Sequence, residues 1–153
     1  MSKKYIGIDP GGNGGIAVLS HDGDVIDVIP MPQTPQDILM SLKSYADGDC
    51  LCVMEDVGYG IPGQSSKATA TFARHNGWLD MALLALDIPT EKVTPHKWIK
   101  TYQMSKTKDM PKSQWKNTLK AKAQQLFPHL GRKLTLKVCD ALLIAEYARR
   151  KNL

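Results

Sequence analysis

The chain has 153 residues, 42% of them hydrophobic, which is enough to bury a core without disulfides or bound metal. Its three cysteines lie in apolar runs and lack zinc-finger spacing, which favours buried free thiols in a reducing cytoplasm. No apolar stretch reaches about 18 residues and the N-terminus leads straight into a strand, so we expect neither a membrane span nor a signal peptide. We expect one domain, residues 1–153, in the cytoplasm.

Charge is distributed unevenly along the chain. Residues 1–76 carry five Lys and Arg against nine Asp and Glu, whereas residues 77–153 carry fifteen against six. A basic half beside acidic residues suggests a polyanionic substrate whose chemistry needs a divalent cation. A soluble protein with a lysine-rich surface would show the same imbalance, so charge alone leaves both interpretations open.

The hydrophobic pattern predicts a mixed α/β fold. Residues 5–9, 15–20 and 25–31 have strand character and are joined by turns, one of which contains Asp22-Gly23, so an antiparallel meander is expected. Further strands are expected at 50–55 and 90–94, helices at 34–46, 66–86, 95–102, 113–127 and 136–151, and a mobile basic loop at 106–112. This order predicts a mixed five-stranded sheet, in which the meander joins parallel strands, flanked by helices.

Three carboxylates occupy unlikely places in hydrophobic segments. Asp9 ends the first strand before a glycine-rich turn, Glu55 ends a continuous apolar strand, and Asp140 interrupts an apolar helix. A charged group in such a segment is costly unless it is paired or bound to a metal. Carboxylate oxygens are the ligands that Mg²⁺ and Mn²⁺ prefer, so the three are candidate metal ligands.

Each assignment has an alternative. Asp9 could instead cap the turn that follows it. Glu55 and Asp56 point to opposite faces of a strand, so only one of them can join a cluster. The element order admits an RNase H-like architecture, in which the ends of the first and fourth strands lie side by side and a C-terminal helix crosses near them. The three carboxylates could then converge, although their spacing does not prove it.

Short segments spread over nearly the whole chain match a known family in its own order. They are residues 6–11 with 14–15, 54–57, 62–64, 72 with 77–78, 93–98 and 140–147. On these residues the sequence resembles the RuvC family of Holliday junction resolvases, in particular its phage-type members. Sugar kinases and actin-like ATPases also have a glycine-rich turn after an early Asp, but they need two such domains and this chain is too short for them.

The resemblance implies an RNase H-like homodimer that hydrolyses branched DNA with divalent metal, in a bacterial cell or a phage-infected host. By motif position, Asp9, Glu55 and Asp140 would hold Mg²⁺ or Mn²⁺, with two ions in each active site. Bacterial members usually carry an acid or a histidine three residues before the last carboxylate, where this chain has Lys137. Lys137 could pair with Asp140 within the helix, assist catalysis at the phosphate, or face solvent or the DNA backbone.

Candidate DNA contacts follow the second acidic strand and continue through the basic half. Lysines there would contact phosphates, which positions DNA without reading its sequence. The candidates are Gln64, Ser66, Lys67, Lys97, Lys100, Lys106, Lys108, Lys112, Lys116, Lys120 and Lys122. Two other functions stay open: an RNase H-like nuclease that processes structured RNA, and a junction-binding protein that has lost catalysis, with Lys137 as the mark of that loss.

Overall fold

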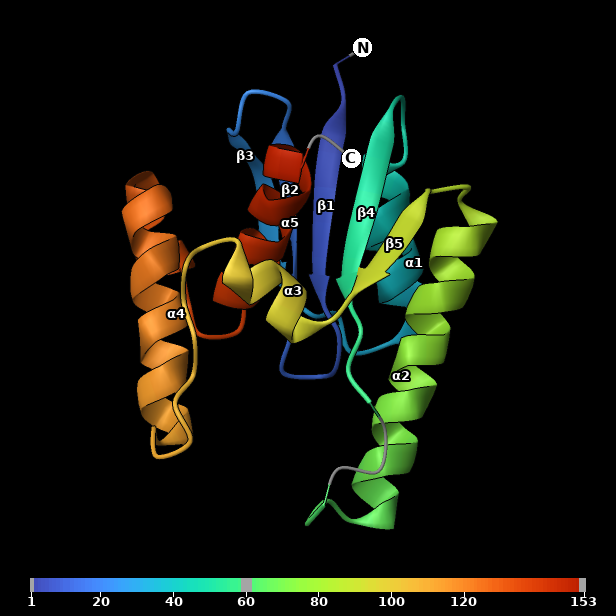
Figure 1. Ribbon diagram of the computed structural model, residues 1–153. Helices are drawn as coiled ribbons and strands as arrows, with labels where there is room; N and C mark the ends of the chain where they lie inside the picture. The colour runs from blue at the N-terminus through green and yellow to red at the C-terminus, as the bar shows by residue number, and fades with distance from the viewer. Residues whose placement is uncertain (1, 59–61, 152–153) are drawn as a thin grey trace.

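The computed structural model describes residues 2–58 and 62–151, which form a β-sheet between two layers of helices (Figure 1). The elements in chain order are β1 (Lys4–Asp9), β2 (Gly15–Ser20), β3 (Val25–Pro30), α1 (Pro35–Tyr45), β4 (Cys50–Glu55), α2 (Ser66–Ala85), β5 (Thr90–Val93), α3 (Pro95–Lys100), α4 (Lys112–Leu126), the 3-10 helix η1 (Pro128–Lys133) and α5 (Cys139–Lys151). Within these ranges, no helix has the length and apolar character that crossing a membrane requires.

The sheet has the strand order β3-β2-β1-β4-β5. β1, β2 and β3 form the expected antiparallel meander, and β4 pairs parallel with both β1 and β5. In the β1–β4 register Ile8 lies opposite Met54, so Asp9 and Glu55, the next residues, end neighbouring strands. The mixed sheet expected from the sequence is confirmed.

Side chains of β1 and β4 alternate between two cores. Ile6 and Ile8 belong to the core that includes residues of α1 and α2, whereas Tyr5 and Val53 belong to the core that includes residues of α3, α4 and α5. Figure 1 shows α5 in front of the sheet and α1 behind it. Because direction alternates along a strand, the carboxylates that end β1 and β4 are directed to the α5 side.

Two glycines let α5 and the turn before it approach the sheet closely. A Cβ atom at Gly7 would overlap the backbone of Ala141 and Ala145, and one at Gly15 would lie 2.8 Å from the carbonyl oxygen of Lys137. Any larger residue at these two positions would push the helix away. The glycines therefore set how near the first turns of α5 come to the end of β1.

The last helix begins later than the sequence pattern predicted. α5 starts at Cys139, and residues 135–138 form a turn in which the Val138 N–H donates to the Thr135 carbonyl at 3.2 Å. Lys137 is exposed and precedes the helix. The intrahelical ion pair between Lys137 and Asp140 is therefore not formed.

Candidate active site

The structure brings together the three carboxylates that the sequence singled out. Asp9 and Glu55 end adjacent parallel strands, and Asp140 is the second residue of α5. Burial raises the pKa of Asp9 well above its usual range, and the charges of Asp140 and Glu55 raise it further. The three groups are thus close enough to repel one another.

The cluster is poorly accessible to water. Glu55 is 9% exposed and Asp140 is 7% exposed. Burial raises the pKa of Glu55 to about 7; a hydrogen bond from Trp98 lowers it, and the charge of Asp140 raises it. A buried carboxylate whose pKa lies so high is only partly ionised at neutral pH, so a nearby positive charge would favour its ionised form.

Lys116 is the cation that the structure places beside these carboxylates. Its Nζ donates a hydrogen bond to Asp140 Oδ2 at 3.0 Å, reaching across from α4. Burial lowers the pKa of Lys116, but the charges of Asp140 and Asp9 outweigh burial, so its pKa is raised overall. Lys116 is therefore charged at neutral pH.

Sequence reasoning assigned Lys116 to phosphates and considered Lys137 as the lysine of the site. Asp140 lies 24 residues from Lys116, so the pairing depends on how α4 packs against α5. The buried stripe of α4, Trp115, Leu119 and Ala123, makes that packing. No local sequence pattern indicates which lysine next to these buried residues of α4 reaches the carboxylates.

Trp98 holds the second carboxylate. Its Nε1 donates a hydrogen bond of 2.7 Å to Glu55 Oε2, and its ring is 1% exposed in the core beneath α5. This hydrogen bond was not predicted from the sequence. The match at residues 93–98 was the only signal that this segment belongs near the site.

The cluster meets the requirements of a divalent cation only in part. Within residues 2–58 and 62–151, no three Asp, Glu, His or Cys side chains are arranged as a ready ligand group. Lys116 occupies one oxygen of Asp140, and the other lies 3.3 Å from the thiol of Cys139. The donor set itself fits, because it consists of carboxylate oxygens, and Lys116 pairs with only one of the three carboxylates. These side chains would have to move to bind a metal.

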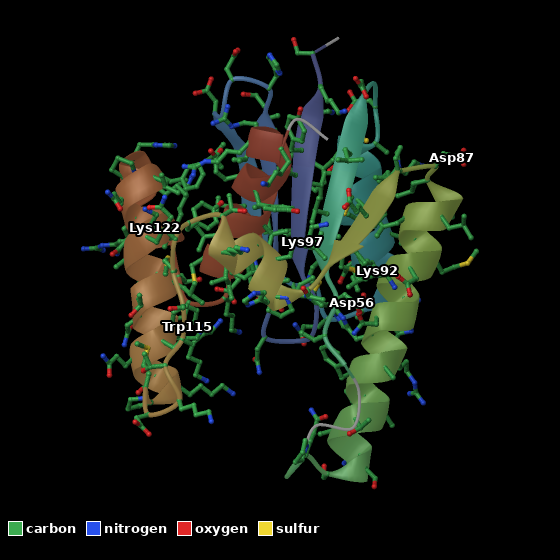
Figure 2. All side chains as sticks on the ribbon, viewed as in Figure 1. Asp56, Asp87, Lys92, Lys97, Trp115 and Lys122 are labelled. Atoms are coloured by element: carbon green, nitrogen blue, oxygen red, sulfur yellow. The ribbon has the colours of Figure 1, made fainter. Side chains whose placement is uncertain are left out.

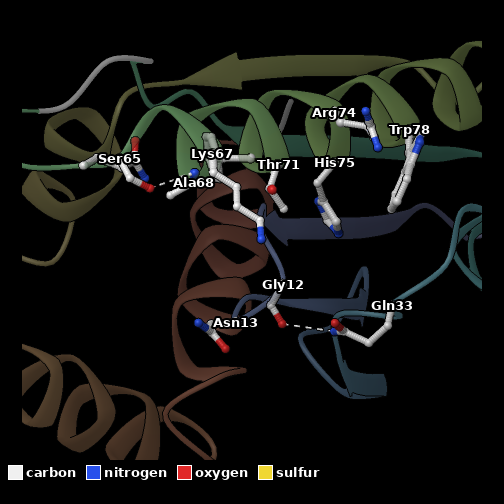
Figure 3. A pocket seen from close by; sticks show the side chains of 12 residues that line it. Gly12, Asn13, Gln33, Ser65, Lys67, Ala68, Thr71, Arg74, His75 and Trp78 are labelled. Carbon is white, nitrogen blue, oxygen red and sulfur yellow. Dashed lines mark hydrogen bonds between the residues drawn. The ribbon is translucent and has the colours of Figure 1, made fainter.

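Some predicted DNA contacts lie at the start of α2. Gln64 and Lys67 line a cavity of about 600 Å³ between α2 and the β1–β2 turn, and Phe72 lines it as well. Figure 3 shows Lys67 extending from α2 toward Gly12 of that turn, three residues after Asp9. The exposed Ser66 is the first residue of α2. The structure thus places these candidates near the edge of the sheet where Asp9 ends β1.

The two lysines of α3 lie elsewhere. Lys97 and Lys100 line a cavity of about 450 Å³ together with Lys151, and Lys97 pairs with Glu91 at 3.8 Å. Lys151 is separated from Asp140 by about 16 Å of helix, at 1.5 Å for each residue. The part of this cavity that Lys151 lines is therefore distant from Asp140, although Trp98 of the same helix α3 contacts Glu55.

The remaining lysines follow the chain from α3 into α4. Lys106 and Lys108 are exposed in the loop, and Lys112 is the first residue of α4. Lys112 lies one turn before Lys116, on the same side of the helix, so the loop leads to the site. Figure 2 shows Lys122 farther along α4, where its Nζ lies 3.4 Å from the side-chain oxygen of Gln125.

Comparisons with known proteins identify the fold. No protein-family model and no curated protein matches the chain. Among solved structures, the chain is similar to T. thermophilus RuvC in complex with a Holliday junction substrate, with a TM-score of 0.67 and 12% identity over 97% of this chain and 96% of that one. The chain has the RuvC fold.

A second structure of Thermus thermophilus RuvC agrees, with a TM-score of 0.62 and 13% identity over the same shares of the two chains. The RNase H-like fold class expected from the sequence is therefore confirmed. The assignment to phage-type members stays a prediction. The cluster of Asp9, Glu55 and Asp140 lies at the carboxyl ends of two adjacent parallel strands of this RuvC fold.

Proposed function

We propose that the protein is a divalent-metal-dependent endonuclease that cleaves Holliday junctions and other branched DNA. The observation that carries this proposal is the cluster of Asp9, Glu55 and Asp140, with Lys116, at one edge of a RuvC fold. Two further observations support it: a protein of the same fold has been solved with a Holliday junction substrate, and the C-terminal half of this chain is strongly basic.

Asp9, Glu55 and Asp140 would hold Mg²⁺ or Mn²⁺, with two ions in each active site. When bound, such cations supply Lewis-acid polarisation of the phosphate and lower the pKa of an attacking water. Trp98 keeps one oxygen of Glu55 engaged and so orients the carboxylate. These roles involve only the three carboxylates and Trp98.

Lys116 has two roles in this proposal. In the observed arrangement it neutralises Asp140. If Asp140 held a metal instead, Lys116 Nζ would be free to stabilise the negative charge that grows on the scissile phosphate during the displacement. The exposed Lys137, which we considered for this part from the sequence, is assigned instead to contacts with DNA phosphates.

We also propose a homodimer, because α1 and α2 expose large apolar side chains. Met40 is 69% exposed, Met81 62% and Leu84 71%. Met81 and Leu84 lie one turn apart on α2, and Met81 lines an apolar hollow with Leu39 of α1. Soluble monomers rarely leave several such side chains together on one surface. A second copy of the chain covering them would let one particle cut two strands of a junction. Light scattering of the wild type and of Leu84→Lys tests this, since a dimer should become a monomer.

The deciding experiment offers synthetic four-way junctions, linear duplex and structured RNA to the wild type, with and without Mg²⁺. We expect Mg²⁺-dependent cleavage of the junction, and little cleavage of linear duplex. Preferred cleavage of RNA would overturn the DNA assignment in favour of an RNA-processing nuclease.

A junction-binding protein without catalysis is the second candidate. It is favoured by the ion pair of Lys116 with Asp140 and by the lack, in the part of the chain that the structure describes, of a ready ligand group. In the same experiment it would bind the four-way junction tightly and leave it intact at every metal concentration. That result would overturn the endonuclease.

A further inference from the structure

A groove of about 870 Å³ lies between α4, the end of β3 and the turn that leads from η1 to α5. Its walls carry four cations from three segments, and its remaining lining is largely apolar. The cations are Lys120 on α4, Arg132 and Lys133 on η1, and Lys137 in the turn; the apolar side chains are Val28, Pro30, Leu134, Leu136 and Val138. None of the described residues that line it is acidic.

The four cations are not neutralised within the protein. Arg132, Lys133 and Lys137 are exposed, and Lys120 is half-buried. In the described ranges of the chain, none of them forms an ion pair, whereas Lys4, Lys92, Lys97, Lys116, Arg149 and Arg150 all do. Like charges held in one groove repel one another and raise the local concentration of an anion. The groove therefore carries positive charge that a bound anion would neutralise.

The groove begins at the candidate active site. The carbonyl oxygen of Lys137 lies against Gly15, which pairs with Asp9 in the sheet. On α4, Lys120 is one turn beyond Lys116, about 6 Å along the helix. A row of positive charge thus runs from the ion pair at Asp140 into the groove.

The lining also indicates which part of a nucleic acid fits. No aromatic ring lies among the described residues of the groove, so it has no platform on which unpaired bases could stack. Lysine and arginine side chains beside an apolar floor suit phosphates and sugars, whose contacts hold DNA in place without reading sequence. A double-stranded arm presents these groups and keeps its bases inside.

The geometry points to a second DNA-binding site in this groove, which holds the sugar–phosphate backbone of one duplex arm as it leaves the scissile phosphate. This inference rests on the proposed function and deepens it, because it names the part of the branched substrate that lies along α4 and η1. Arg132 and Lys133, which the sequence reasoning did not single out, become DNA contacts.

The test compares two triple variants that remove the same charge. The groove variant is Arg132→Gln, Lys133→Gln and Lys137→Gln. The control variant is Lys3→Gln, Lys43→Gln and Lys92→Gln, none of which lines the groove. Affinity for a four-way junction and for linear duplex is measured over a salt series, and thermal unfolding checks that both variants fold.

We expect the slope of log affinity against log salt to fall by about 2 to 3 in the groove variant, since each lost phosphate contact removes about 0.9. The control should keep the wild-type slope. Hydroxyl-radical footprinting of the junction should show protection of one arm by the wild type, lost in the groove variant. A wild-type slope and footprint in the groove variant would overturn the inference, as would an equal fall in the control.

The two proposals fail separately. If the wild type cleaves junctions but the groove variant binds like the wild type, the assignment of the groove to DNA is wrong and the proposed endonuclease function is retained. If no junction is cleaved, and yet only the groove variant shows a smaller slope of log affinity against log salt on linear duplex, the groove is a DNA-binding site and the proposed endonuclease function is wrong. Protection confined to unpaired nucleotides would overturn the assignment to a duplex arm.

Discussion

Trp98 and Glu55 are joined by a buried hydrogen bond of 2.7 Å between Nε1 and Oε2. The two residues come from α3 and the end of β4, 43 residues apart in sequence. Indole nitrogen can only donate, so the bond favours the ionised form of Glu55 and fixes one of its oxygens. It opposes burial, which favours the neutral form.

Replacing Trp98 with Phe should therefore raise the pKa of Glu55 further and move the rise of cleavage rate to higher pH. The substitution keeps a buried aromatic ring but removes the donor and part of the buried volume of the indole, at a loss of about 1 to 3 kcal/mol in the free energy of unfolding. A pH–rate profile measures the effect. Trp115→Phe is the matched control, because Trp115 packs in the same core. An unchanged profile in Trp98→Phe would remove its positioning role.

Asp9→Asn, Glu55→Gln and Asp140→Asn should each abolish Mg²⁺-dependent cleavage while leaving junction binding intact. Each removes a carboxylate from the cluster without removing a DNA contact, and a less negative site repels phosphate less. Gel shift and cleavage assays on one junction separate the two effects. Asp56→Asn is the control, since Asp56 follows Glu55, is exposed and lies just beyond the end of β4. Full activity in a cluster variant would exclude that residue.

Replacing Lys116 and Lys137 in separate variants shows which of the two lysines assists catalysis. The structure favours Lys116, whereas Lys137 was considered from the sequence. Lys116→Gln should slow cleavage about a hundredfold, the effect of losing one electrostatic stabiliser in a site. Lys137→Gln should leave the single-turnover rate near that of the wild type and weaken binding in a salt-dependent way. If Lys137→Gln gives the larger loss of rate, the catalytic lysine is Lys137 after all. Lys137→Asp, in turn, should not restore activity to any cluster variant.

Elements with a local physical signal were predictable from the sequence. Apolar runs with turn residues between them gave the strands. The Thr34 cap, whose Oγ1 accepts from the Asp37 N–H at 3.1 Å, marked the start of α1. Asp9 and Glu55 were identified because each ends a strand, and parallel neighbours end at the same edge of a sheet.

Features that depend on packing between distant segments were not predictable. Apolar periodicity extended the last helix back to residue 136, although the turn before Cys139 lies against Gly15 instead. That error put Lys137 on the helix. The pairing of Lys116 with Asp140 depends on the distance between α4 and α5, which no local pattern encodes.

The raised pKa of Glu55 makes stability depend on pH. Its pKa goes from 4.5 to about 7 on folding, which corresponds to about 3 kcal/mol. Because the folded state holds the proton more tightly, this stabilisation is complete below about pH 4.5 and is lost as pH rises through about 7. Without metal, urea denaturation should show stability falling over this range, and Glu55→Gln should flatten the fall.

Divalent metal should reverse this fall of stability with rising pH, since the metal competes with the proton for the same carboxylate oxygens. The rise in unfolding temperature caused by Mg²⁺ should be larger at pH 8 than at pH 6, and absent in Glu55→Gln. Cleavage should rise with pH through about 7 for the same reason. An equal Mg²⁺ effect at both pH values would show that metal does not bind at Glu55.

The close approach of α5 to the sheet can be tested by replacing each of two glycines with alanine in separate variants. Gly7→Ala places a methyl group on the backbone of Ala141 and Ala145, so α5 must move and carry Asp140 away from Asp9. We expect a loss of about 3 kcal/mol or more in the free energy of unfolding, at the upper end of overpacking effects. Gly77→Ala in α2 meets nothing within 4 Å and should stabilise by about 1 kcal/mol, because alanine favours helix. Urea denaturation of both variants measures the difference. Equal stabilities would mean that α5 does not rest on β1 at Gly7, and the cluster of Asp9 with Asp140 would then lose its structural basis.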